Sequence, residues 1–84
     1  MSGSKSMSLP TVQRVIELSA ARFKLDPSAL RPDGDVFASL GIDSMQVLEL
    51  LSELELELDV QIPDYELRGV KTFAELARVI DRRL

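Results

Sequence analysis

The residues best suited to chemistry are Asp43, Ser44 and Gln46, where a loop leads into a strongly patterned helix. Asp43, followed three positions later by Gln46 and then by an apolar run, forms a capping box with Ser44 as the first helical residue. Because the Asp43 carboxylate accepts from the first-turn amides, the Ser44 hydroxyl can project into solvent at the positive helix end. A phosphodiester on Ser44 would suit that position. Most serines in a first turn only help the helix to start, so this pattern alone favours a purely structural role.

The composition argues against catalysis by the chain itself. It contains no cysteine and no histidine, which excludes disulfides, zinc sites and the common nucleophile–base pairs. Carboxylate and lysine chemistry stays open, and any thiol must come from an attached group. Asp33 and Asp35 resemble the start of a calcium loop, but Ala38 and Ser44 stand where that loop needs glycine and glutamate. We therefore expect a non-enzyme without a metal site.

Charge is separated along the sequence. The net charge is −4, and ten acids and no base lie between Asp33 and Glu66, whereas all ten bases lie elsewhere. Nucleic acid is a disfavoured partner because phosphate binding needs a clustered basic face; basic protein surfaces are expected instead. No apolar stretch approaches the ~20 residues of a membrane span, and the first residues lack the apolar core of a signal peptide. We expect a monomeric, cytoplasmic protein without a membrane span.

The apolar spacing predicts an all-α fold, a small bundle of three main helices and one short helix. Residues 1–8 are expected to be a disordered segment or a cloning remnant, and residues 9–84 to form one domain. The connection over residues 25–42 is expected to be held to the core by Leu30, Phe37 and Leu40. The main helices are expected over residues 9–24, 44–58 and 73–84, and the short helix over residues 64–68.

The helix over residues 44–58 carries the main ambiguity. Residues 53–62 alternate polar and apolar side chains, which by period alone indicates a strand. Leucine and glutamate favour helix and no second strand is available for pairing, so a helix is predicted to about Leu58. Its core face comprises Val47, Leu51, Leu54 and Leu58, flanked by Leu48 and Leu50.

Met45 and Leu56 fall on the acidic side of this helix instead of its core face. Scattered exposed apolar residues are normal, but apolar anchors among charges are also typical of partner-binding helices. We define the predicted docking face as Met45, Glu49, Ser52, Glu53 and Leu56.

Two stretches resemble the acyl carrier protein family. Residues 35–45, DVFASLGIDSM, look like its attachment site, and residues 60–64, VQIPD, look like its segment after the second helix. The resemblance covers roughly residues 9–84 and implies an acyl-carrier-like four-helix bundle in a discrete carrier domain. It implies that Ser44 carries 4′-phosphopantetheine from coenzyme A, attached by a phosphopantetheinyl transferase, and that Asp43 belongs to the recognition motif. The arm's thiol would hold acyl groups as thioesters for acyltransferase, acyl-activating and synthase enzymes.

By the same resemblance, Met45 and the acids after it meet basic partner surfaces, and the bundle interior shelters the acyl chain. Met45 and Gln46 depart from the leucine and acid usual in fatty-acid carriers, and Leu56 replaces a common charge. These departures favour a carrier of polyketide or other specialised metabolism over one of fatty acid biosynthesis. An aminoacyl or peptidyl carrier of a nonribosomal-peptide-type pathway is the alternative, and an unmodified helical adaptor is a third interpretation.

Overall fold

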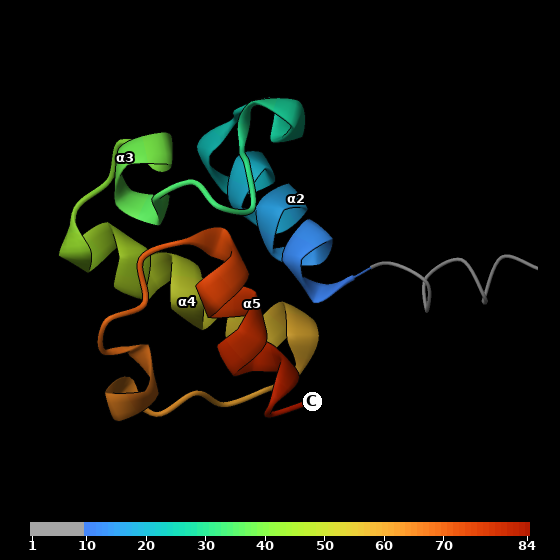
Figure 1. The fold of residues 1–84 in the computed structure, drawn as a ribbon, viewed down its shortest axis with the longest axis vertical. Coiled ribbons are helices and arrows are strands. Elements are labelled where there is room, and N and C mark those ends of the chain that lie inside the picture. Colours follow the sequence, from blue (N-terminus) through green and yellow to red (C-terminus); the bar gives the residue numbers. More distant parts are fainter. Residues whose placement is uncertain (1–9) are drawn as a thin grey trace, which may run out of the picture.

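The computed structural model describes residues 10–84, which form a bundle of helices without a strand (Figure 1). In chain order the elements are α2 (Thr11–Phe23), η1 (Pro27–Ala29), α3 (Val36–Leu40), α4 (Ser44–Leu58), η2 (Asp64–Leu67) and α5 (Phe73–Asp81), η1 and η2 being 3₁₀ helices. The predicted all-α class is confirmed. Ser8 and Leu9, where the first helix was predicted to start, lie outside the described residues.

Helix α2 is amphipathic and buries one face against α5. It follows Pro10, which offers no side-chain cap, and ends at Lys24, whose φ of 58° is left-handed. The buried Ser19 hydroxyl donates to the Val15 carbonyl oxygen at 2.7 Å, so this polar group is satisfied inside the core. The side chains at the centre of the bundle are fully buried, namely Val15, Ala20, Leu54, Phe73 and Ile80.

Helix α4 runs from Ser44 to Leu58, as predicted, and not as a strand. Leu51, Leu54 and Leu58 are buried, and Leu50, expected only to flank them, is 1% exposed. Val47, predicted in the core, is only partly buried. The helix ends at Asp59 in a left-handed conformation, with its N–H bonded to the Glu55 carbonyl oxygen.

The segment over residues 25–42 was predicted as a connection, and this was incomplete because it contains η1 and the short helix α3. Asp35 caps α3 by accepting from the Ala38 N–H at 2.9 Å, and Gly41 ends it with a φ of 67°. The Val36 N–H donates to the Lys71 carbonyl oxygen at 2.7 Å, which ties α3 to the approach of α5. Of the predicted anchors, Leu30 and Leu40 are buried and Phe37 is half-buried.

Two predicted boundaries near the C-terminus also need correction. The short helix after Pro63 is a 3₁₀ helix that ends at Leu67, before Gly69. Helix α5 starts at the predicted Thr72–Glu75 capping box but ends at Asp81. Leu84 was expected on its apolar face and is 62% exposed. Arg82 and Arg83, which lie between the end of α5 and Leu84, are exposed and offer no apolar contact to hold another turn.

Candidate functional site

The start of α4 is fixed by a reciprocal pair of hydrogen bonds. The Gln46 N–H donates to Asp43 Oδ1 at 2.9 Å, and the Asp43 N–H donates to Gln46 Oε1 at 3.2 Å. This confirms the predicted capping box, with Ser44 as the first helical residue. The preceding loop is held by Ile42, which is buried and whose N–H donates to the Phe37 carbonyl oxygen at 3.1 Å. A loop anchored to the core therefore presents Ser44.

The Ser44 side chain is exposed, and within residues 10–84 its hydroxyl has no hydrogen-bond partner. The first turn of α4 contains no acidic side chain, and the Asp43 carboxylate is engaged by the Gln46 amide. An anionic phosphodiester at Ser44 would thus lie at the positive end of a helix of 15 residues. The residues at this position fit such a group without rearrangement of the cap.

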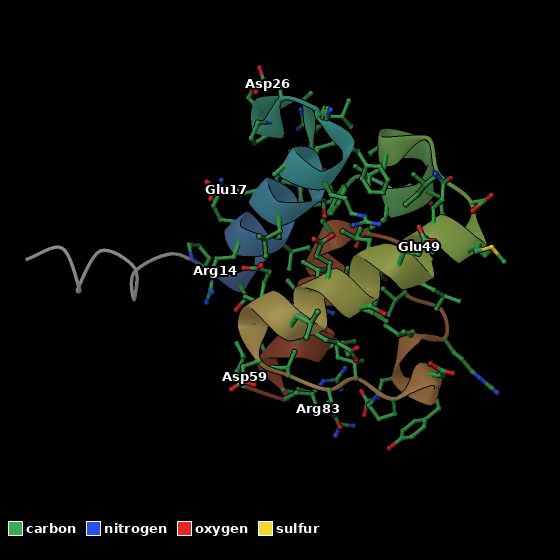
Figure 2. All side chains as sticks on the ribbon, turned by 180° about the vertical axis from the view of Figure 1, so that it is seen from behind. Arg14, Glu17, Asp26, Glu49, Asp59 and Arg83 are labelled. Atoms are coloured by element: carbon green, nitrogen blue, oxygen red, sulfur yellow. The ribbon has the colours of Figure 1, made fainter. Side chains whose placement is uncertain are left out.

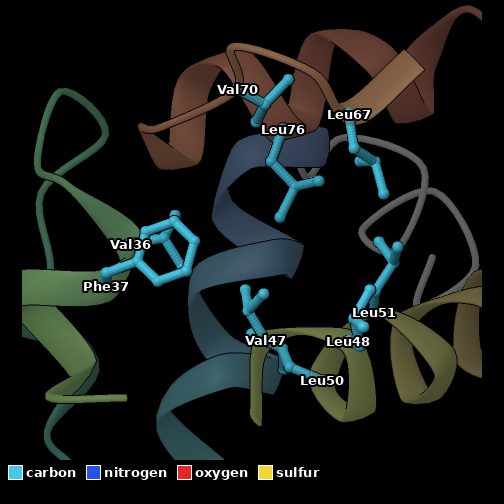
Figure 3. Close-up of a pocket in the computed structure, with 9 residues that line it drawn as sticks. All are labelled: Val36, Phe37, Val47, Leu48, Leu50, Leu51, Leu67, Val70 and Leu76. Carbon is cyan, nitrogen blue, oxygen red and sulfur yellow. The ribbon is translucent and has the colours of Figure 1, made fainter. Parts of the chain in front are cut away.

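An apolar cavity lies close to this helix start (Figure 3). Its volume is about 110 Å³, and it opens between α3, α4 and the residues that lead into α5. Val47 and Leu48 line it one turn after Ser44. All of its lining residues are apolar, namely Val36, Phe37, Val47, Leu48, Leu50, Leu51, Leu67, Val70 and Leu76.

Comparison with known proteins connects this geometry to a family. Residues 13–80 match the family described as phosphopantetheine attachment site. The acyl carrier proteins of Rickettsia massiliae and Rickettsia felis are 32% identical to the chain over 71 residues, covering 84% of it and 83% of theirs. The chain belongs to the acyl carrier protein family. The acyl carrier protein of Syntrophobacter fumaroxidans is 30% identical over 63 residues, covering 75% of this chain and 78% of its own.

The family match also confirms the expected prosthetic group of the carrier. That group is 4′-phosphopantetheine, and it is covalently attached. When bound, it supplies a terminal thiol, the chemical group that a chain without cysteine cannot supply itself.

The predicted docking face of the carrier lies on the solvent side of α4. Met45 is 72% and Leu56 is 83% exposed, Ser52 is also exposed, and Glu53 is half-buried. Glu49 is exposed too, and Figure 2 labels it on α4. Leu56 therefore does not pack against the residues of η2. The structure places these side chains on one helix, while their role in docking stays a prediction.

Two interactions of the α4 acids had no signal in the sequence. Arg22 of α2 forms ion pairs with both Glu49 and Glu53, although these residues are far apart in the chain. Glu55 Oε2 accepts from the Ile62 N–H at 2.8 Å and so fixes the VQIPD segment to the end of α4. Such contacts depend on how helices and loops pack, which no local spacing reports.

Within residues 10–84 of the carrier, no three carboxylates gather closely enough to hold a metal ion. In the same part of the chain, no helix is long and apolar enough to cross a bilayer.

Proposed function

We propose that Ser44 is the residue that carries 4′-phosphopantetheine, within a carrier domain over residues 9–84, and that Asp43 belongs to the motif read by the transferase. The observation that supports this most is the exposed Ser44 hydroxyl, which has no partner among the described residues and lies beside an already satisfied N-cap. The bound arm offers its thiol for acyl groups held as thioesters. The chain itself contributes position, charge and shelter, and no catalytic group is proposed.

The cavity beside α4 supports an acyl cargo over an aminoacyl one. Its lining is entirely apolar, so an ammonium group placed inside would lose its hydration without a compensating partner. A volume of about 110 Å³ is somewhat smaller than the ~150 Å³ apolar cavities that take up benzene. We infer that it accepts a short acyl chain. Met45, Gln46 and Leu56, which depart from fatty-acid carriers, support a role in polyketide or other specialised metabolism.

Intact-mass measurement tests the attachment site. The chain is incubated with a broad-specificity phosphopantetheinyl transferase and coenzyme A, and a gain of one phosphopantetheine is expected. Ser44→Ala should abolish the gain and melt like the wild type, because the hydroxyl bonds to no described residue. Ser39→Ala removes an exposed serine of α3 and should leave the gain intact. An unchanged wild-type mass would favour the adaptor, and a gain that persists in Ser44→Ala would place the site elsewhere.

The same transferase can test the cargo. Loading the chain from hexanoyl-coenzyme A should shift the methyl signals of Val47 and Leu76 in nuclear magnetic resonance spectra, because both side chains line the cavity. Loading from β-alanyl-coenzyme A should leave them unmoved. Equal shifts with both arms would remove the support for an acyl carrier over an aminoacyl carrier.

A further inference from the structure

Arg22 crosses from the last turn of α2 to the acidic side of α4. One guanidinium nitrogen, Nη1, hydrogen-bonds to Glu53, and the other, Nη2, lies 3.6 Å from Glu49 Oε1. The guanidinium carbon also lies 5.8 Å from the centroid of the Phe23 ring, which helps to hold the side chain in place. Of the cations that form ion pairs within residues 10–84, only Arg22 pairs with the predicted docking face.

We propose that Arg22 is a built-in competitor for the basic residues of partner enzymes, a specificity-determining residue that such a partner must displace from Glu49. The inference rests on the proposed function, because it assumes that enzymes reach Ser44 across this face of α4. The partner is a protein surface that presents a lysine or arginine beside a shallow apolar contact. The ten acids and absence of bases between Asp33 and Glu66 supply the charge complementarity.

The two acids hold Arg22 unequally, which decides where a partner can enter. Glu53 receives a direct hydrogen bond and its side chain is 45% exposed. Glu49 is 61% exposed, and its separation of 3.6 Å from Arg22 exceeds a normal hydrogen bond. Glu49 can therefore exchange Arg22 for a partner cation at low cost, while Arg22 stays attached to Glu53. The predicted entry point for the partner cation is Glu49.

The competition has a consequence for partner choice. A partner cation that approaches Glu49 is repelled by the nearby positive guanidinium of Arg22. This repulsion weakens the binding of any partner that relies on charge alone. A partner that also covers the exposed side chains of Met45 and Leu56 gains contact area that Arg22 does not oppose. Arg22 thus favours partners that make apolar contact with this face over partners that bind it by charge alone.

The test measures kcat/KM for phosphopantetheine transfer to the full chain at low ionic strength. Arg22→Gln should raise kcat/KM by about three- to tenfold, the scale of one nearby like-charge contact at a protein surface. The gain should shrink towards unity in 0.5 M sodium chloride, where screening is effective beyond a few ångströms. Arg22→Lys keeps the charge and should resemble the wild type.

Arg14→Gln is the matched control. It removes the same charge from an exposed residue of α2 but lies eight positions earlier, or about 12 Å along the helix, and Figure 2 shows it at the opposite end of the bundle from Glu49. It should change kcat/KM less than twofold. Equal gains in Arg14→Gln and Arg22→Gln would mean that net charge is responsible and would overturn the proposal. A wild-type chain that is not modified at all would instead refute the proposed function.

A second measurement on the native Arg22 does not depend on how its variants fold. The transferase is added without coenzyme A to Ser44→Ala, and the Nε signal of Arg22 is followed by nuclear magnetic resonance. The signal should shift as the partner cation replaces Arg22 at Glu49. A signal that stays unmoved while the transferase binds would show that Arg22 is not displaced, and the proposal would fail.

Discussion

Two regions of the bundle are packed differently. In the first, which we name the solid region, Val15, Ala20, Leu54, Phe73 and Ile80 are all 0% exposed. In the second, the hollow region, α3, the first half of α4 and residues 64–70 surround a cavity of about 110 Å³. Phe37, Val47 and Leu67 line that cavity and are only partly buried.

This difference in packing indicates that the two halves of α4 have different roles. Fully buried side chains such as those of the solid region are closely packed in protein interiors, which stabilises the fold and tolerates little change in side-chain volume. The hollow region lacks some of these packing contacts, so its apolar lining can surround an added group. A chain of 84 residues can leave one region loose only because the other holds the helices together.

The largest expected effect contrasts two leucine truncations. Leu54→Ala empties a fully buried position of the solid region and should lower the free energy of unfolding by ~2–5 kcal/mol. Leu67→Ala only enlarges an existing cavity from a partly buried position, and should cost about 1 kcal/mol or less. Urea denaturation measures both. Equal losses of unfolding free energy in the two variants would remove the distinction between the regions. A loss near zero for Leu54→Ala would mean that α4 turns a different face towards the core.

The next effect comes from adding volume. Ala20→Leu overfills the solid region and should destabilise the fold by ~1–3 kcal/mol. Val47→Phe points added volume into the cavity and should change stability by less than about 1 kcal/mol, because the space is already there. In the acylated chain, Val47→Phe should also expose the thioester to faster cleavage by hydroxylamine. If Val47→Phe destabilises as much as Ala20→Leu, the cavity is not available space.

The solid region was more predictable from the sequence than the hollow one. The capping boxes were enough to predict the starts of α4 and α5, because these signals are local. The end of α4 followed from helix propensity, since the apolar spacing of residues 53–62 alone indicates a strand. Helix α3 was missed because its five residues are too few to show a helical period. Only Asp35 and Gly41 mark its ends. Val47 was predicted in the core but is only partly buried. A helical wheel shows towards which side of the helix a side chain points, but not whether neighbouring side chains fill the space there.

The candidate site divides in the same way. Ser44 and its cap could be predicted because Asp43 and Gln46 lie within one helical turn. The pairing of Arg22 with Glu49 and Glu53 could not, because it depends on how α2 crosses α4. The exposure of Met45 and Leu56 followed from the helix period alone, and the structure confirms it.

A smaller effect concerns the link between the regions, where the Glu75 carboxylate accepts from the Lys71 and Thr72 N–H groups at 2.8 and 3.1 Å. These bonds, the one from Lys71 foremost, lower the pKa of Glu75 below its ordinary value of 4.5. The stabilisation is therefore present above that value and is lost as the pH falls through the lowered pKa of the folded state.

Glu75→Gln should therefore lower the melting temperature at pH 7. The difference from the wild type should vanish in strong acid, where Glu75 itself is protonated. Glu17→Gln removes one charge from an exposed acid of α2 and leaves the bonds to Lys71 and Thr72 in place, so it is the control for net charge. A difference that persists unchanged in acid would show that the charge of Glu75 does not matter.

The smallest expected effect tests whether the two regions also differ in charge. Elements α3, α4 and η2 around the cavity lie in the segment with ten acids and no base, so their mutual repulsion should fall as salt is added. The melting temperature should rise modestly with sodium chloride.

Asp59→Asn removes an acid from the negative end of α4 while keeping a residue that tolerates the left-handed conformation. It should raise the melting temperature by about 2–4 °C at low salt and by less at high salt. A wild-type melting temperature that falls with salt would mean that the ion pairs of Arg22 with Glu49 and Glu53, and of Arg83 with Glu66, outweigh the repulsion.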